Sequence, residues 1–196
     1  LSAGNESIPV RTRIIGKQHV YNCLAAAAAA ATFGIELDVI AQGLESARIP
    51  GRLERIDCGQ PFGVWIDSAL TPNQLTSAIG AVGRVCEGRL WCIASTDDSQ
   101  SAAQRQRLGE ILERQTEKSV ICQSSTPANM DYELAHQVLD GFDNPARTRV
   151  IPDRFQAMEW VLSQAREQDA VLIAGCGEKR NRLGHDDDRF VNDREF

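Results

Sequence analysis

Two short turns carry the side chains best suited to chemistry. The first, Pro50-Gly51-Arg52-Leu53-Glu54, places an arginine just before an expected strand. The second, Ile66-Asp67-Ser68-Ala69-Leu70-Thr71-Pro72, places an aspartate where the next expected strand ends. An arginine binds phosphate or ribose oxygens through its planar fork, and a carboxylate accepts hydrogen bonds from ribose hydroxyls. Together they could hold a nucleotide, and the alternative is that both turns are ordinary loops around a strand.

The sequence that positions these turns alternates between strand and helix patterns from Gly51 onward. Strands are expected at residues 53–58, 63–66, 89–94, 119–122, 147–151 and 170–174. Helices are expected at residues 73–86, 100–116, 130–139 and 155–167. This alternation predicts an α/β fold, a Rossmann-like and mostly parallel sheet with helices on both faces. Ligands bind such sheets at the carboxyl ends of the strands, where the loops after Asp67, Ala94, Cys122 and Ala174 gather.

The segment before these turns is expected to be mainly helical, after one strand at residues 8–15. Residues 17–33 predict a helix that Gly34 closes, and residues 36–46 predict a second helix. Seven consecutive alanines at residues 25–31 permit very close packing against a neighbouring element. Because a helix pair without a sheet leaves an apolar face uncovered, this piece is expected to pack on the rest of the chain or on another chain. Self-association through the alanine-rich helix is one such outcome.

Length and composition are those of a globular chain with a buried core. The 196 residues are 42% hydrophobic and 24% charged, which is ordinary for soluble proteins. The net charge of −6 argues against nucleic acid as the main partner. The long apolar run from Cys23 to Phe33 is too short to cross a bilayer, so no membrane insertion is expected. Since the first residue is Leu1 rather than methionine, the chain is expected to be an excised fragment or a processed product.

The cysteines and histidines predict no metal site and no disulfide framework. No C-x-x-C pair occurs among the six cysteines, and several lie in apolar segments, which favours small buried thiols in a reducing cytoplasm. The three histidines lie far apart in the sequence. His185 precedes three aspartates that could bind a cation weakly, but a solvated acidic turn is the preferred interpretation.

Five motifs in this order resemble the C-terminal part of the Mur ligases, and most of all the MurE-type UDP-N-acetylmuramoyl-tripeptide synthetases. Besides the two turns, they are Gly16…Asn22-Cys23-Leu24-Ala25-Ala26, Asp153-Arg154-Phe155-Gln156-Ala157-Met158 and Leu172-Ile173-Ala174-Gly175-Cys176-Gly177-Glu178. The resemblance implies that residues 1–49 are the end of the central, ATP-binding domain and that residues 50–196 are the C-terminal domain. It also implies a role in peptidoglycan synthesis in the cytoplasm.

The resemblance implies ATP-dependent ligation, but only together with residues that this sequence lacks. A Mur ligase joins a carboxylate to an amine through an acyl phosphate, which requires a phosphate-binding G-x-x-x-x-G-K-[ST] loop and Mg²⁺. The sequence contains no such loop. ATP, Mg²⁺ and a UDP-muramoyl-peptide are therefore expected to bind the intact parent enzyme, and this fragment alone is expected to bind none of them tightly and to be inactive.

The same resemblance assigns individual residues to the ligands. Asn22 is expected to contact adenine, Arg52 to reach the nucleotide from the C-terminal domain, and Asp67 to bind the ribose. Gly175 and Glu178 fall on the segment that contacts the substrate.

The residues alone allow structural alternatives for the nucleotide contacts. In those alternatives Asn22 bonds within the helix pair, and Arg52 pairs with Glu54 or Glu45. Asp67 would then cap the helix that follows it.

Several polar ligands of the family are missing. The histidine of its Y-A-H-T-P motif is Leu70, and no arginine occurs in the loop of residues 95–101 or at residues 125–128. The family uses arginines in those two loops to clamp the carboxylate of the incoming diamino acid. In the segment Gly175-Cys176-Gly177-Glu178-Lys179, which matches G-K-G-H-E, the lysine and the histidine of the motif are replaced by Cys176 and Glu178. These departures argue against meso-diaminopimelate or lysine as substrate. They leave another amino acid, or a degenerate nucleotide- or amino-acid-binding module without chemistry, as the alternatives.

Other polar and aromatic residues are expected to be structural. Asp153 should cap a helix and Arg154 should anchor that helix to the sheet, whereas Arg105 and Arg107 should face water. The tryptophans are expected in the core, and they are Trp65, Trp91 and Trp160.

Overall fold

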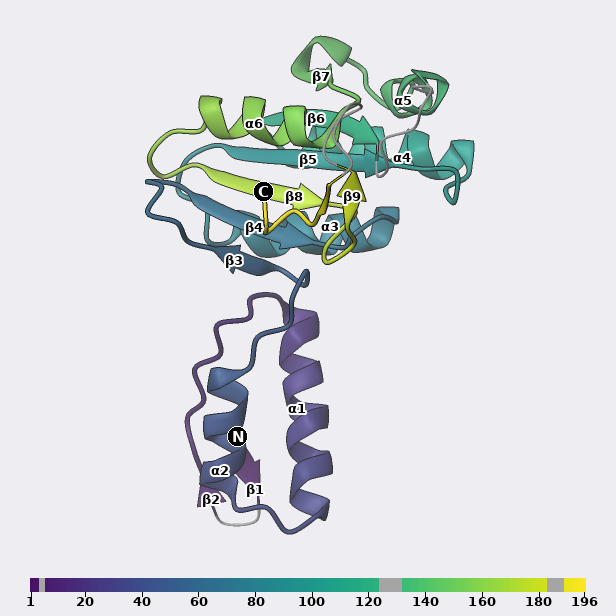
Figure 1. Ribbon diagram of the computed structural model, residues 1–196. Helices are drawn as coiled ribbons and strands as arrows, with labels where there is room; N and C mark the ends of the chain where they lie inside the picture. Colours follow the sequence, from purple (N-terminus) through teal and green to yellow (C-terminus); the bar gives the residue numbers. More distant parts are fainter. Residues whose placement is uncertain (4–5, 124–131, 183–188) are drawn as a thin grey trace. The chain divides into compact units, whose positions relative to one another are not determined.

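The computed structural model describes residues 1–3, 6–123, 132–182 and 189–196 (Figure 1). The chain divides into two units, Leu1–Ile49 and Pro50–Phe196. Each unit has its own secondary structure.

Two helices dominate the first unit. They are α1 (Lys17–Thr32) and α2 (Leu37–Ser46), and a small antiparallel pair, β1 (Ser2–Ala3) and β2 (Glu6–Ser7), precedes them. Gly34, with φ +75°, follows α1 as predicted, because a left-handed residue ends a helix at little cost when it has no side chain. Of the alanine run only Ala27 is buried, while Leu24 and Phe33 are 49% and 85% exposed. The expected uncovered apolar surface is therefore present.

The strand predicted at residues 8–15 is wrong. That segment forms no strand, and no strand of the described part of this unit extends alongside it. Its polar groups bond to partners outside any sheet: the Arg11 N–H donates to Glu45 Oε1 on α2 at 2.9 Å, and the Thr12 hydroxyl donates to the Ile14 carbonyl at 3.0 Å. Pro9 has no N–H to contribute to a ladder. Alternation of residue types cannot make a strand without a neighbour.

A six-stranded sheet forms the centre of the second unit, in the order β3-β4-β8-β5-β6-β7. The strands are β3 (Glu54–Ile56), β4 (Gly63–Asp67), β5 (Leu90–Thr96), β6 (Lys118–Gln123), β7 (Thr148–Val150) and β8 (Ala170–Ala174). The edge strand β3 is antiparallel to β4, and every other neighbouring pair is parallel. All residues of β5 and β8 are buried, as expected for central parallel strands covered on both faces. The predicted α/β fold with a mostly parallel sheet is confirmed.

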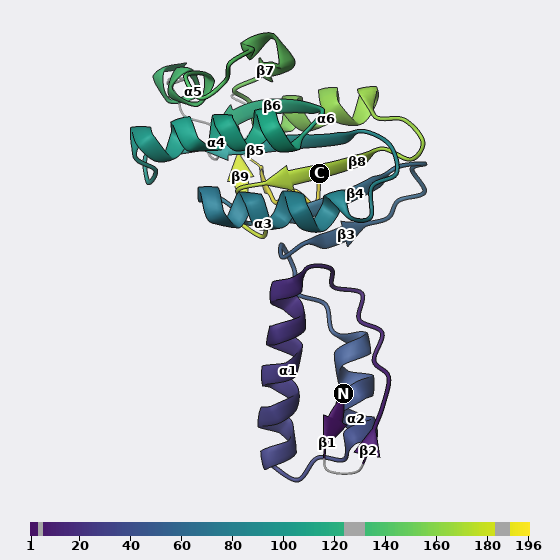
Figure 2. The ribbon, with the colours of Figure 1, turned by 180° about the vertical axis from the view of Figure 1, so that it is seen from behind.

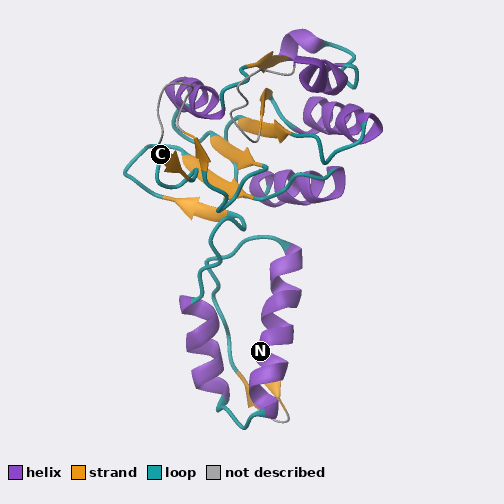
Figure 3. Cartoon of the chain, turned by 45° about the vertical axis from the view of Figure 1, so that its right-hand side comes forward, coloured by secondary structure: helices purple, strands orange, loops and turns teal. Residues whose placement is uncertain are grey.

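Helices cover both faces of this sheet, as Figures 2 and 3 show from two further sides. On one face lie α3 (Pro72–Gly83) and α4 (Ala102–Gln115), with α5 (Tyr132–Leu139) beside α4; on the other lies α6 (Arg154–Gln164). The core beneath α6 contains Trp91 and Phe155, together with valine and isoleucine side chains of four strands. Trp65 and Trp91 are buried as predicted, and Trp160 packs edge-on against Trp91 with ring centroids 6.0 Å apart.

Side chains at the helix starts fix where the loops at the carboxyl ends of the strands begin and end. Gln104 and Ser101 bond reciprocally at the start of α4, where Ser101 Oγ accepts the Gln104 N–H at 3.3 Å. Asp153 accepts the Gln156 N–H at 2.9 Å, so its predicted capping role is confirmed.

After β8, the chain continues through β9 (Asn181–Arg182) and β10 (Phe190–Val191), which pair in antiparallel fashion. A 3-10 turn, Pro145–Arg147, precedes β7.

Candidate functional site

Three loops meet at the carboxyl ends of β4 and β8. The Ser68 N–H donates to the Gly51 carbonyl, and the Gly175 N–H donates to the Asp67 carbonyl, both at 3.0 Å. Gly51 has φ +61°, and a Cβ added there would lie 2.7 Å from the backbone nitrogen of Glu178. Gly177 has φ +58°, and a Cβ there would lie 2.9 Å from Ser68 Cβ. Glycine is required at both positions because the three loops approach within backbone contact.

Asp67 ties the first turn to the second. Its side chain is buried; Oδ2 accepts the Leu53 N–H and Oδ1 accepts the Ala69 N–H, each at 2.8 Å. Leu53 has φ +46°, an uncommon conformation for a residue with a side chain, and its bond to Asp67 helps to hold it there. The alternative that Asp67 caps the following helix is wrong, because the N-cap of α3 is Thr71.

Arg52 is exposed at the tip of the first turn. Within the described residues its guanidinium makes no hydrogen bond and no ion pair. The alternative pairing with Glu54 is wrong, because Glu54 accepts the Gly51 N–H at 2.9 Å and pairs with Arg194 at 3.2 Å. The other alternative partner, Glu45, belongs to the first unit, where it accepts the Arg11 N–H. The turn is thus built by its other residues, and the Arg52 side chain is available to a ligand.

The structure brings four of the five predicted site residues into the second unit. Arg52, Asp67, Gly175 and Glu178 all lie on the converging loops, and Glu178 is exposed. Asn22 lies on α1 in the first unit, where it is exposed and its side chain forms no hydrogen bond with the described residues. The alternative that Asn22 bonds within the helix pair is not seen in that unit.

A buried arginine that the sequence assigned only to anchoring joins the ends of three strands. Arg154 Nη1 donates to Ser95 Oγ on β5, to the Ala174 carbonyl on β8 at 3.1 Å, and to Cys122 Sγ on β6 at 3.5 Å. Its Nε and Nη2 each donate to one carboxylate oxygen of Asp193, at 2.7 Å. Burial alone would lower the pKa of Arg154, but the hydrogen bonds and charge of Asp193 outweigh burial and raise it. The anchoring prediction is confirmed, and the partner Asp193 was missed.

The loop after β5 is closed by a second buried arginine. Arg105 Nε donates to Gln137 Oε1 at 2.7 Å, and its Nη1 donates to the carbonyls of Asp97, at 3.0 Å, and Gln100. The prediction that Arg105 faces water is wrong. Its signal was its spacing, because it precedes the buried Leu108 and Leu112 by three and seven residues on α4. Arg107 is exposed and pairs with Glu110, as expected of a residue that faces water.

Gln100 links this loop to the loop after β4. It is buried, and its Nε2 donates to the Leu70 carbonyl at 2.7 Å. The amide of Gln100 is thus engaged with the protein itself. The residues at 125–128, where the second clamping arginine was found to be missing, lie outside the described residues, as do 185–188.

All six cysteines are free. Cys92, Cys122 and Cys176 are buried, and burial raises the pKa of each thiol, so these are unreactive packing residues. Cys58 is exposed, so the prediction of buried thiols does not hold for it. No cluster of His, Cys, Asp or Glu side chains that could hold a metal ion occurs in the part of the chain that the structure describes.

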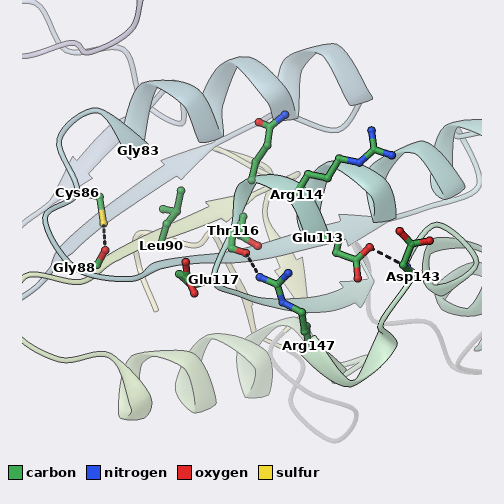
Figure 4. A pocket seen from close by; sticks show the side chains of 11 residues that line it. Gly83, Cys86, Gly88, Leu90, Glu113, Arg114, Thr116, Glu117, Asp143 and Arg147 are labelled. Carbon is green, nitrogen blue, oxygen red and sulfur yellow. Dashed lines mark hydrogen bonds between the residues drawn. The ribbon is translucent and has the colours of Figure 1, made fainter.

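A polar cavity of about 600 Å³ lies at the opposite end of the strands, beside the amino ends of β5 and β6 (Figure 4). Its charged groups bond to neighbouring backbone: Glu113 accepts the N–H groups of Asp143 and Asn144, at 2.8 and 2.7 Å, and Arg147 donates to the Thr116 carbonyl at 3.2 Å. In Figure 4 the Arg114 side chain points away from these groups. This cavity is separate from the loops that carry the predicted site.

A family model described as "Mur ligase, glutamate ligase domain" matches residues 51–177, more than half of the chain. The chain belongs to the Mur ligase family. The resemblance drawn from the motifs is confirmed, and the matched region of this Mur ligase chain contains all three converging loops except Pro50 and Glu178.

Curated relatives of this Mur ligase chain include two UDP-N-acetylmuramoyl-L-alanyl-D-glutamate–2,6-diaminopimelate ligases. That of Syntrophomonas wolfei is 30% identical over 199 residues, covering 97% of this chain and 41% of the relative. That of Geobacillus kaustophilus is 30% identical over 192 residues, covering 94% of this chain and 39% of the relative. The chain therefore spans about two fifths of the length of these relatives.

Solved structures agree with this assignment. A diaminopimelate ligase of the same description is 25% identical, with a TM-score of 0.62 over 87% of this chain and 35% of that one. Folylpolyglutamate synthase of Mycobacterium tuberculosis, in complex with ADP and AMPPCP, has a TM-score of 0.67 at 22% identity, over 85% and 39%. MurC of Thermotoga maritima, a UDP-N-acetylmuramate–alanine ligase, has a TM-score of 0.68 at 18% identity, over 90% and 38%. The last two show the shared fold. Among the described helices of this Mur ligase chain, none combines the length and the apolar character needed to cross a membrane.

Proposed function

We propose that this chain is the C-terminal portion of an ATP-dependent ligase that adds an amino acid to a UDP-N-acetylmuramoyl-peptide in cytoplasmic peptidoglycan synthesis. One observation carries the proposal. At the carboxyl ends of β4 and β8, backbone contacts and Asp67 hold a turn whose arginine, Arg52, is exposed and has no partner among the described residues. A guanidinium presented in this way suits the phosphate or ribose oxygens of a nucleotide.

In this proposal the two units have different roles. Residues 1–49 are the end of the ATP-binding domain, whose remaining elements would cover the exposed apolar side chains of α1, and Asn22 would contact adenine. Residues 50–196 would close over the nucleotide with Arg52, while Asp67 lies at the ribose and Gly175 and Glu178 line the substrate side. ATP supplies the phosphoryl group and Mg²⁺ neutralises its charge; both require the phosphate-binding loop that this sequence lacks. The chain alone is therefore inactive in ligation.

The incoming amino acid is proposed to differ from diaminopimelate. A carboxylate needs an unoccupied cation, and Arg105 already donates to Gln137, Asp97 and Gln100. Gln100 is likewise occupied with Leu70. This occupation of polar groups also favours a second candidate, a degenerate module that binds a nucleotide or an amino acid without chemistry. Titration with a panel of amino acids tests the exclusion of diaminopimelate, because a low-micromolar dissociation constant for diaminopimelate would contradict it.

Calorimetry of the 196-residue chain with ADP and Mg²⁺ tests the nucleotide contact. We expect weak binding, which Arg52→Ala weakens by about fivefold, since an exposed charge-assisted contact contributes roughly 1 kcal/mol. Arg84→Ala is the matched control: it removes the same charge from an exposed arginine at the C-cap of α3, at the other end of that helix from the converging loops. Equal affinities of the Arg52→Ala and Arg84→Ala variants would remove Arg52 from the nucleotide site.

A further inference from the structure

The last residues of the chain, 192–196, pack as a turn against the body of the second unit and are called here the C-terminal segment. The Asn192 side chain accepts two backbone N–H groups within the segment, at 3.1 and 2.9 Å. The Phe196 ring lies 4.9 Å from the ring of Phe155 at the start of α6. These contacts leave Asp193 buried, with its side chain fully removed from solvent.

Asp193 reaches the candidate site through Arg154. The two side chains form a paired, two-bond contact at 2.7 Å, and both are at least 97% buried. The remaining donors of Arg154 bind Ser95 and the Ala174 carbonyl, where β5 and β8 end. The next residue, Gly175, begins the loop that touches the Arg52 turn. Asp193 therefore fixes the guanidinium that holds the start of this loop.

Arg194 is linked to the same site through a second side chain, Glu54. Its Nη1 lies 3.2 Å from Glu54 Oε1, and Glu54 Oε2 accepts the Gly51 N–H at 2.9 Å. Gly51 immediately precedes Arg52, so this chain of contacts ends at the turn that presents the exposed guanidinium. Two consecutive residues of the C-terminal segment thus lead to two of the three converging loops.

We propose that the C-terminal segment is a positioning element of the nucleotide-facing edge, in which Asp193 acts through Arg154 and Arg194 acts through Glu54. Neither residue touches the ligand. Their effect is to hold the loop of residues 175–178 and the Arg52 turn in the relative placement that the structure shows. The nucleotide part of this inference rests on the proposed function, and the placement of the loops does not.

A simple stabilising role is the alternative, and the chemistry of buried ion pairs allows the two to be separated. Removing one partner leaves a buried charge unpaired, which destabilises any protein regardless of function, whereas replacing both by apolar residues of similar size is often neutral. The double variant Arg154→Met with Asp193→Leu removes the contact without leaving a charge. Ser95 Oγ retains Cys122 Sγ as a partner at 3.4 Å.

The test measures hydrogen exchange of the full 196-residue chain at residues 50–54 and 175–178, alongside thermal melting and titration with ADP and Mg²⁺. In the double variant we expect the native melting transition, about tenfold faster exchange in both loops, and weaker ADP binding. Arg194→Ala, at an exposed position, should speed exchange by about threefold at residues 50–54 alone. Arg180→Gln is the control, because the one ion pair of Arg180 among the described residues is an exposed contact with Glu195 of the C-terminal segment, and its loss should leave exchange in both loops unchanged.

Native exchange in both loops of a folded double variant would overturn the proposal. If that variant does not fold, Arg194→Ala decides alone, and unchanged exchange at residues 50–54 would overturn the positioning role. A wild-type chain that binds no ADP would count against the proposed function, while the exchange rates would still decide this inference because they require no ligand.

Discussion

Replacement of Gly51 by alanine tests whether the three loops are held by backbone contact. The added Cβ would lie 2.7 Å from Glu178 N and 2.8 Å from two backbone atoms of Gly177. Backbone atoms cannot rotate away as the end of a side chain can, so one loop must move. The left-handed conformation costs an alanine about 1–2 kcal/mol, and forcing the loops apart adds about 1–3 kcal/mol. We therefore expect Gly51→Ala to lower the free energy of unfolding by about 2–5 kcal/mol.

Gly59 provides a matched control within the same unit. It also has a positive φ, +87°, but nothing lies within 4 Å of an added Cβ. Gly59→Ala should therefore show the conformational cost alone, about 1–2 kcal/mol. Urea unfolding of both variants, with the slope checked for constancy, measures the difference. Equal losses in the two variants would refute the argument that the loops are in contact, and Gly51→Ala should also weaken ADP binding because it displaces the Arg52 turn.

Three further predictions concern stability. Asp193→Ala leaves Arg154 buried and unpaired, so it should lower the free energy of unfolding by about 3–5 kcal/mol in urea, and a loss below 1 kcal/mol would contradict the buried pair. Gly80→Ala, inside α3 with open space around the new Cβ, should raise the free energy of unfolding by about 0.5–1 kcal/mol; a decrease would show a contact that the structure does not have. Asp169 opposes the cost of its burial by accepting bonds from Arg89 and three other groups, which lowers its pKa to about 2. The ionised Asp169 carboxylate therefore contributes about 2 kcal/mol at most to the free energy of unfolding. This contribution is present above the unfolded pKa near 4 and is lost as the pH falls toward 2. In urea unfolding at a series of pH values, the Asp169→Asn variant should lack this part of the acid dependence.

Secondary structure was predicted best where the residues of a single segment were enough to indicate its burial. Residues 90–94 and 170–174 are continuous apolar runs, which favours burial on both faces of a sheet, and the helices carry caps and periodic apolar positions. The boundaries moved by at most three residues, since a helix end depends on the cap actually used: α3 ends at Gly83 rather than at the predicted residue 86. The strand predicted at residues 8–15 failed for the opposite reason, because pairing depends on a neighbour that local sequence does not reveal.

The candidate site was harder to predict than the fold, because its contacts join residues far apart in the chain. Asp193 meets Arg154 across 39 positions, and Asp67 meets Leu53 across 14. Nothing in the local pattern of an exposed-looking, charged tail indicates that one of its aspartates is buried. Arg105 illustrates a different limit: its helical spacing placed it on the buried face, but the general preference of arginine for water suggested the reverse.

The first turn shows which member of a motif is available for function. Gly51 is required by its positive φ and by the approach of Gly177, and Glu54 closes the turn by accepting the Gly51 N–H. Leu53 is buried, and its N–H is held by Asp67. Arg52 alone makes no hydrogen bond or ion pair with the described residues, and it is exposed. Because its neighbours account for the shape of the turn and Arg52 does not contribute to it, the structure of this turn supports the proposal that Arg52 binds a ligand.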